Sequence, residues 1–231
     1  MIPRTRKILK NIEVAFKEEE NPVKAKRMAA YMKDHFPFYG LQKKERQELS
    51  RPFINELIKK YPEEAGDFCH ALWQKDQREF HYFGLDLLAR TKKHWNQPDS
   101  IELVEYLIVH KSWWDTVDFL CVNCAGLLLA SHEELVMYRE KWLFSNNMWL
   151  NRSAILYQLK YKDKTDEDFL YEIVRYNRDD KRFFIRKAIG WALREYSKTN
   201  LDFVLNVLDK IELSGLSKRE ALKYATKNNW I

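Results

Sequence analysis

The sequence is poor in the residues that interrupt or cross-link regular structure. Its 231 residues include six glycines, six prolines and three cysteines. Three cysteines are few and odd in number, which argues against a disulfide framework. No apolar run approaches the ~20 residues that a bilayer requires, and the basic first seven residues lead into no apolar stretch. We therefore expect a cytoplasmic protein with neither a membrane span nor a signal peptide.

The composition is that of a folded protein with an uneven charge distribution. Apolar residues make up 45% and aromatic residues 14% of the chain, too many for a disordered segment. The length suits one domain, which we place at 1–231. Residues 1–60 carry a net charge of +7, residues 61–180 a charge of −7 and residues 181–231 a charge of +6. Two basic ends favour binding of a polyanion, although ordinary solvated helix faces would give the same totals.

Apolar residues recur at helical spacing along nearly the whole chain. Ile8, Ile12, Val14 and Phe16 form one such set, and Met28, Tyr31, Met32 and His35 form another. Five segments resemble helix starts: 21–22, 61–64, 97–99, 131–134 and 165–168. The sequence has neither a sustained alternation of apolar and polar residues nor an Asn-Gly or Asp-Gly turn. We predict an all-α protein.

A weak internal repeat indicates how the helices are organised. Four segments align, each with an aromatic residue or leucine, three further residues and then an apolar helix; they begin at Phe80, Trp114, Leu150 and Phe184, separated by 34, 36 and 34 residues. A second amphipathic segment follows each one, at 101–109, 132–143, 167–176 and 201–209. Helix pairs at this period predict an α-solenoid of HEAT-like repeats with a concave basic groove. Equivalent helices then carry Asp118, Arg152 and Trp191, and we expect these side chains to share one face.

Common catalytic and metal-binding motifs are absent from the sequence. Cys121 and Cys124 have CxxC spacing, but a zinc site needs four ligands and no second pair follows. Within the apolar segment 119–129 we expect these cysteines to be small core residues. The sequence also lacks a glycine-rich phosphate loop, GxSxG and HExxH. We expect neither a metal nor a cofactor.

Three segments combine aromatic residues with charge. The segment 111–118, KSWWDTVD, has two tryptophans beside two carboxylates. In the simpler interpretation one tryptophan is a core residue, Ser112 and Asp115 form a capping box, and Asp118 is solvated. Segments 149–154 and 181–196 interleave basic and aromatic residues, which suits contacts to phosphates and stacking on sugars or bases; Lys187 is one of these basic residues.

At these segments the sequence resembles the HEAT-repeat alkylpurine-DNA glycosylases, the AlkD family of DNA alkylation repair enzymes. The resemblance lies in AAYMKDHF (29–36), KSWWDTVD (111–118), NMWLNRSAILYQLKYK (147–162) and FFIRKAIGWALREYSKTN (183–200), and extends over about residues 20–225. It implies a monomeric, monofunctional glycosylase that removes cationic N3- and N7-alkylated purines from double-stranded DNA in the cytoplasm, at the nucleoid. The alternative of another class is a non-catalytic HEAT-like module that binds nucleic acid or protein.

The resemblance also assigns roles to individual residues. It implies a catalytic cluster of Trp114, Asp118 and Trp191, and DNA contacts by Tyr31, Arg152 and Arg194, to which the basic segment adds Lys187. Tyr31 lies in AAYMK where the family has an arginine before the tyrosine, a small departure. The three catalytic positions match the family pattern, and retention of Asp118 argues against inactive relatives that lack this carboxylate.

Overall fold

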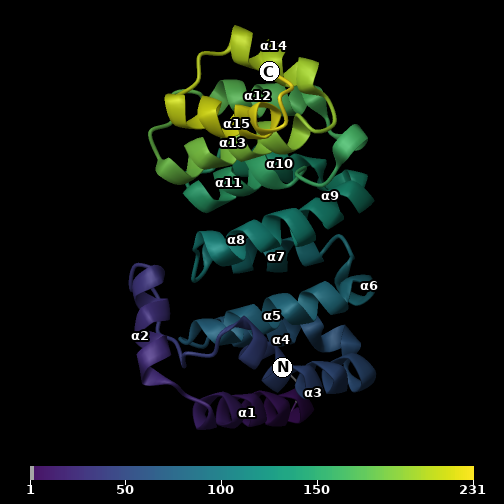
Figure 1. Cartoon of the computed structure of the whole chain (residues 1–231). Helices are drawn as coiled ribbons and strands as arrows, with labels where there is room; N and C mark the ends of the chain where they lie inside the picture. The colour runs from purple at the N-terminus through teal and green to yellow at the C-terminus, as the bar shows by residue number, and fades with distance from the viewer. Residues whose placement is uncertain (1–2) are drawn as a thin grey trace. The chain divides into compact units, whose positions relative to one another are not determined.

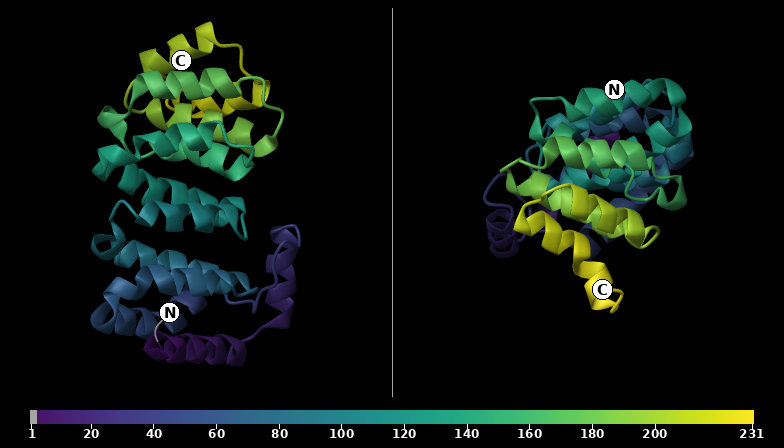
Figure 2. Two further views of the ribbon diagram at one scale, coloured as in Figure 1. Left: turned by 180° about the vertical axis from the view of Figure 1, so that it is seen from behind. Right: turned by 90° about the horizontal axis from the view of Figure 1, so that it is seen from above.

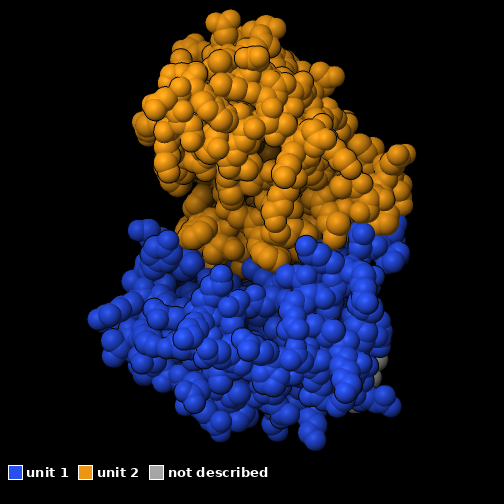
Figure 3. Space-filling view, turned by 45° about the vertical axis from the view of Figure 1, so that its right-hand side comes forward, with its two compact units in different colours: residues 1–103 blue, residues 104–231 orange. Residues whose placement is uncertain are grey.

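The computed structural model describes residues 3–231, and every regular element in this range is a helix (Figure 1). No strand occurs among these residues, so the all-α prediction is confirmed. The chain divides into two compact units, residues 1–103 and residues 104–231 (Figure 3). The boundary falls within helix α7 (Ser100–Val109).

The first unit is built from six helices in its described residues and the start of α7. These are α1 (Pro3–Glu18), α2 (Pro22–Tyr31), α3 (Lys43–Lys60), α4 (Ala65–Trp73), α5 (Arg78–Arg90) and α6 (Lys92–Trp95), with a 3-10 turn η1 (Pro62–Glu64) before α4. Helix α2 runs across the direction of α1 (Figure 1). It begins as predicted, because the Asn21 side chain accepts a hydrogen bond from the Lys24 backbone at 3.0 Å. It ends at Tyr31, so Met32 and His35, which were predicted to belong to the same helix as Met28 and Tyr31, lie beyond its end.

The second unit contains the rest of α7 and the remaining helices of the described residues. They are α8 (Trp114–Leu120), η2 (Cys121–Ala125), α9 (Gly126–Ser131), η3 (Glu133–Leu135), α10 (Val136–Leu143), α11 (Met148–Leu156), η4 (Lys162–Lys164), α12 (Glu167–Asn177), α13 (Phe183–Tyr196), α14 (Leu201–Lys210) and α15 (Gly215–Lys227). The aligned segments fall on α5, α8, α11 and α13, and the amphipathic segments on α7, α10, α12 and α14. The sequence therefore located both helices of each pair.

Helices α8 and α9 form one continuous helical run through the π-helical turn η2. The run, Trp114–Ser131, is long and apolar enough to cross a membrane by length and composition, with a mean hydropathy of 1.2. The expectation that no segment approaches this length was therefore wrong. Half of the run is buried inside the protein, as in a core helix. The run includes Cys121 and Cys124, which are buried core residues as predicted, and burial raises the pKa of the Cys121 thiol.

Helices α13 and α15 approach each other unusually closely, and Figures 1 and 2 show them side by side. Gly190 of α13 permits the approach. A Cβ atom at this position would lie 2.5 Å from the Cβ of Glu220 and 2.8 Å from the carbonyl oxygen of Ser217. The Ser217 hydroxyl donates to the Arg186 carbonyl at 3.0 Å across the same contact. The missing side chain of Gly190 thus sets how near Glu220 comes to α13.

Candidate functional site

A pocket of about 410 Å³ in the second unit gathers most of the predicted site residues. Its lining residues are Trp114, Asp118, Arg152, Phe183, Phe184, Lys187, Trp191, Arg194 and Glu220. The predicted catalytic residues are all among them, with three of the four predicted DNA contacts. Helices α8, α11, α13 and α15 supply these side chains. The expectation that Asp118, Arg152 and Trp191 share one face is therefore confirmed within this unit.

The position of α11 is fixed by two asparagines at its start. The Asn147 side chain accepts hydrogen bonds from the Trp149 and Leu150 backbone amides and so forms the N-cap. The side-chain amide of Asn151 donates to the carbonyls of Trp142 and Leu143 at the end of α10, at 2.8 and 2.9 Å. These bonds satisfy groups that a helix terminus leaves open. They also fix the residue that follows Asn151, which is Arg152.

Arg152 and Asp118 form a two-pronged ion pair at the base of the pocket. Arg152 Nε donates to Asp118 Oδ1 at 2.7 Å, and Arg152 Nη2 donates to Asp118 Oδ2 at 2.9 Å. Arg152 Nη1 donates to the Phe184 carbonyl at 2.5 Å. The arginine is 4% exposed, and the Asp118 side chain is 17% exposed. The pair aims one carboxylate into the pocket with its orientation fixed.

The environment of Asp118 acts on its ionisation in two opposite ways. Burial disfavours the carboxylate and raises the pKa of Asp118 above its ordinary value, while the hydrogen bonds and charge of Arg152 lower it. The charge of Asp115 adds a smaller upward effect. Burial is the larger influence, so the pKa is raised. Arg152 is therefore the group that limits the rise.

The simpler interpretation of segment 111–118 was wrong. Helix α8 begins at Trp114, and its N-cap residue Trp113 makes no side-chain capping bond. The Ser112 hydroxyl instead donates to the Ile108 carbonyl of α7 at 2.6 Å. Asp118 is largely buried and paired, where that interpretation had it solvated.

The two adjacent tryptophans have different surroundings. Trp113 packs edge-on against Trp149 and Phe184, with ring centroids 5.8 and 5.2 Å apart. Trp149 and Phe184 are also in contact, at 5.1 Å. This three-ring cluster supports the Phe184 backbone to which Arg152 donates. Trp114 lines the pocket, so the two tryptophans differ: Trp113 belongs to the aromatic cluster and Trp114 to the pocket wall.

One face of α13 presents a tryptophan between two cations. Lys187, Trp191 and Arg194 are four and three residues apart, which places them along one side of the helix. Glu220 of α15 pairs with both cations: Lys187 Nζ lies 2.8 Å from Oε1, and Arg194 Nη1 lies 2.8 Å from Oε2. The hydrogen bond from Lys187, with the charges of Arg194 and Lys223, holds the pKa of Glu220 below its ordinary value.

Three of the lining residues were not predicted from the sequence as site residues: Phe183, Phe184 and Glu220. Phe183 lies at the start of α13 and is 55% exposed, large exposure for a phenylalanine at a pocket. Phe183 lies in segment 181–196, whose mixture of aromatic and basic residues had already indicated a binding surface. Glu220 belongs to no motif in the sequence and becomes visible only because α15 packs on α13. None of the three was assigned a role.

Two of the predicted DNA contacts, Tyr31 and Arg152, have surroundings unlike those of Lys187 and Arg194. Tyr31 is the last residue of α2 and is 69% exposed. It belongs to the first unit, so its role stays a prediction. The sequence assigned Arg152 a contact with DNA, yet its guanidinium is buried and bonded to Asp118 and Phe184. The structure thus gives Arg152 a positioning contact that the sequence did not indicate.

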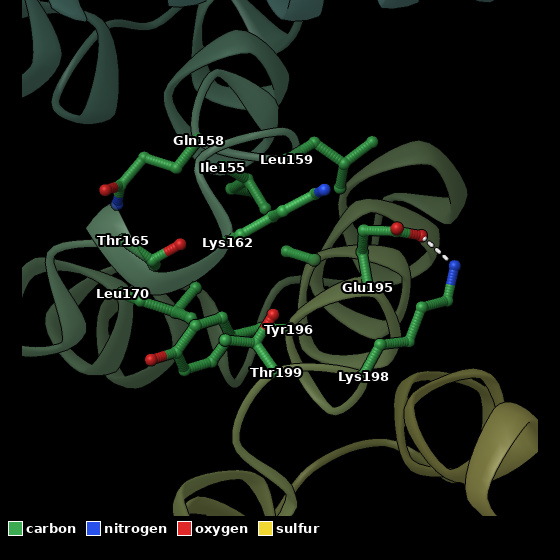
Figure 4. Close-up of a pocket in the computed structure, with 11 residues that line it drawn as sticks. Ile155, Gln158, Leu159, Lys162, Thr165, Leu170, Glu195, Tyr196, Lys198 and Thr199 are labelled. Carbon is green, nitrogen blue, oxygen red and sulfur yellow. Dashed lines mark hydrogen bonds and ion pairs between the residues drawn. The ribbon is translucent and has the colours of Figure 1, made fainter.

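A second pocket of about 260 Å³ opens near the other end of α13 (Figure 4). Lys162, Gln158 and Tyr196 are among its lining residues. Its lining carboxylate, Glu195, is paired with Lys198 at 2.6 Å. Burial and the neighbouring Glu167 raise the pKa of Tyr196 to about 12, so the phenol stays protonated at neutral pH. This pocket offers neither a tryptophan face nor an orienting ion pair like that of Asp118.

The fold and the first pocket together define an all-α protein with a largely buried carboxylate in a pocket that two tryptophans also line, and comparison with known proteins identifies its family. The profile of the DNA alkylation repair enzymes matches residues 12–225. The chain therefore belongs to the DNA alkylation repair enzyme family. It is similar to the solved structure described as "Predicted DNA alkylation repair enzyme from Enterococcus faecalis", with 36% identity and a TM-score of 0.83 over 90% of this chain and 98% of that one. No curated protein gave a significant match to the sequence.

Proposed function

We propose that this protein is a monofunctional DNA glycosylase that hydrolyses the N-glycosidic bond of N3- and N7-alkylated purines in double-stranded DNA. The observation that carries the proposal is the arrangement of Trp114, Asp118 and Trp191 around one pocket in the second unit. Membership of the DNA alkylation repair family supports it. The protein is proposed to work as a monomer without metal or cofactor.

The chemistry of the substrate explains why such a pocket suffices. An N3- or N7-alkylated purine carries a positive charge, so when the N-glycosidic bond breaks its electron pair neutralises the departing base. No general acid is needed. The sugar becomes an oxocarbenium-like cation, which an adjacent carboxylate stabilises. Water then adds to the anomeric carbon and loses its proton, leaving an abasic site.

Asp118 is the proposed stabiliser of that cation. A carboxylate at ~4 Å from a developing positive charge, at an effective dielectric constant of ~20, contributes on the order of 4 kcal/mol, or about a thousandfold in rate. Arg152 fixes the direction of the carboxylate through its two bonds. The indole faces of Trp114 and Trp191 would add cation–π attraction of roughly 0.5–2 kcal/mol each.

Lys187 and Arg194 are the proposed phosphate contacts beside this site, and Tyr31 is the proposed contact from the first unit. The test is incubation of the protein with double-stranded DNA that contains 7-methylguanine, followed by chromatography of the released base. Release above the spontaneous rate supports the proposal. Tight binding of DNA without release would instead support the non-catalytic binding module.

A further inference from the structure

Glu220 is a charged residue of the pocket to which neither the sequence nor the proposed chemistry assigns a task. Its side chain is 14% exposed and accepts from Lys187 and Arg194 with its two carboxylate oxygens. It comes from α15, the helix that Gly190 allows to approach α13. The carboxylate is therefore held by packing beside Trp191, between the cations that flank it.

The charges of the pocket explain what this carboxylate does. The lining residues include three cations, Arg152, Lys187 and Arg194, and two anions, Asp118 and Glu220. Asp118 is already matched by Arg152, so without Glu220 the Trp191 face would lie between two unmatched cations. A positively charged base approaching that face would be repelled by both. A DNA phosphate would be attracted by both, whatever the base.

We propose that Glu220 is a specificity-determining residue, which neutralises Lys187 and Arg194 so that the Trp191 face accepts a cationic base while weakening the attraction to undamaged DNA. The effect on acceptance of a cationic base rests on the proposed glycosylase function. The effect on attraction to undamaged DNA concerns DNA binding alone. Glu220 acts through its two partners and is a positioning residue, not a catalytic one.

The discriminating variant is Glu220→Gln, which keeps the shape of the side chain and removes its charge. We expect its affinity for undamaged double-stranded DNA to rise on the order of tenfold at low salt. The slope of the logarithm of the binding constant against the logarithm of the salt concentration should become steeper by about one to two. We expect the single-turnover rate of 7-methylguanine release, at saturating protein, to fall about tenfold. Saturation separates this loss from the change in binding.

Two further variants distinguish charge from packing. Glu220→Asp retains the charge and should remain within about threefold of the unaltered protein in both measurements. Glu195→Gln, which removes a carboxylate paired with Lys198 at the second pocket, should change neither. Thermal unfolding of all three variants shows whether each is folded.

The inference predicts that Glu220→Gln raises the affinity for undamaged DNA and lowers the rate of base release, two changes of opposite sign. If Glu220 only supports packing, Glu220→Gln should weaken DNA binding and base release together, in proportion to the stability that is lost. That result would overturn the inference. Unchanged binding and an unchanged salt slope would overturn it as well. If the unaltered protein releases no base, the proposed function fails; the affinity and salt slope of Glu220→Gln on undamaged DNA still test the neutralisation of Lys187 and Arg194.

Discussion

Arg152 holds Asp118 by two parallel hydrogen bonds of 2.7 and 2.9 Å, although the residues are 34 positions apart in the sequence. The pair joins α8 to α11, the equivalent helices of successive pairs. It combines in one contact the orientation of a carboxylate and the control of its ionisation.

Replacing Asp118 by asparagine tests the electrostatic role of the carboxylate. The change keeps size and hydrogen bonding but removes the charge, so we expect release of 7-methylguanine to fall about a thousandfold. DNA affinity should stay similar or rise slightly. Single-turnover release and titration binding measure the two quantities. Asp209→Asn on the exposed side of α14 is the control, and full activity of the Asp118 variant would exclude the proposed role.

Arg152→Gln should change the pH dependence of base release. Asp118 acts when ionised, so activity is lost as the pH falls through its pKa, which burial places above the ordinary value. Without the arginine the pKa rises further, and the acid limb of the rate profile should move to higher pH. Arg175→Gln, which disrupts an exposed pair with Glu172, should leave the profile in place.

The same Arg152 substitution has consequences for stability and binding. Removing one partner of a buried ion pair destabilises a protein by about 3–5 kcal/mol, which denaturant unfolding would measure. If Arg152 also contacts one phosphate, binding to damaged and undamaged DNA should weaken alike and the salt slope should flatten by about one. A lower stability with an unchanged slope would limit Arg152 to positioning Asp118.

Graded substitutions at the two pocket tryptophans test the contribution of their ring faces. A phenylalanine retains part of the π-face, whereas alanine retains none. Trp114→Ala and Trp191→Ala should therefore each reduce base release more than the phenylalanine changes, by roughly twofold to thirtyfold for one cation–π contact. Trp230→Ala, at an exposed tryptophan near the end of the chain, is the control. Equal effects of alanine and phenylalanine would indicate packing.

The range of lesions that the protein excises should follow from the proposed mechanism, which has no general acid to protonate the departing base. DNA that carries 3-methyladenine or 7-methylguanine should release free base, whereas uracil, 8-oxoguanine and 1,N6-ethenoadenine should persist. The product strand should be abasic and intact, since no lysine is assigned to form a Schiff base with the sugar. Release assays with and without borohydride test both points. Robust uracil release, or a covalent protein–DNA species, would contradict the mechanism.

Gly190→Ala tests the close packing of α13 on α15. The added methyl group would lie within 3 Å of Glu220 and Ser217, so we expect a loss of about 1–3 kcal/mol in unfolding free energy. Gly215→Ala is the matched control, because a Cβ atom there meets nothing within 4 Å. A destabilisation of Gly215→Ala as large as that of Gly190→Ala would show that glycine loss, not the helix contact, is responsible.

Local signals in the sequence located most of the helices and most of the residues that line the pocket. Apolar spacing and capping residues such as Asn21 and Asp166 are local signals, and a helix needs little else to be located. The repeat placed Asp118, Arg152 and Trp191 on equivalent helices because successive pairs repeat one geometry. The resemblance to a known family then supplied their roles.

The pairing of the pocket residues could be seen only in the tertiary structure. The sequence marks Arg152 as basic and Asp118 as acidic, but a spacing of 34 residues does not reveal that one binds the other. Local reasoning had Ser112 capping α8, whereas its hydroxyl bonds to Ile108 of the preceding helix. Glu220 has no local signature, since its partners lie on another helix that Gly190 brings close. Helices form from interactions between near neighbours, while the charge balance of a pocket depends on which distant side chains packing brings together.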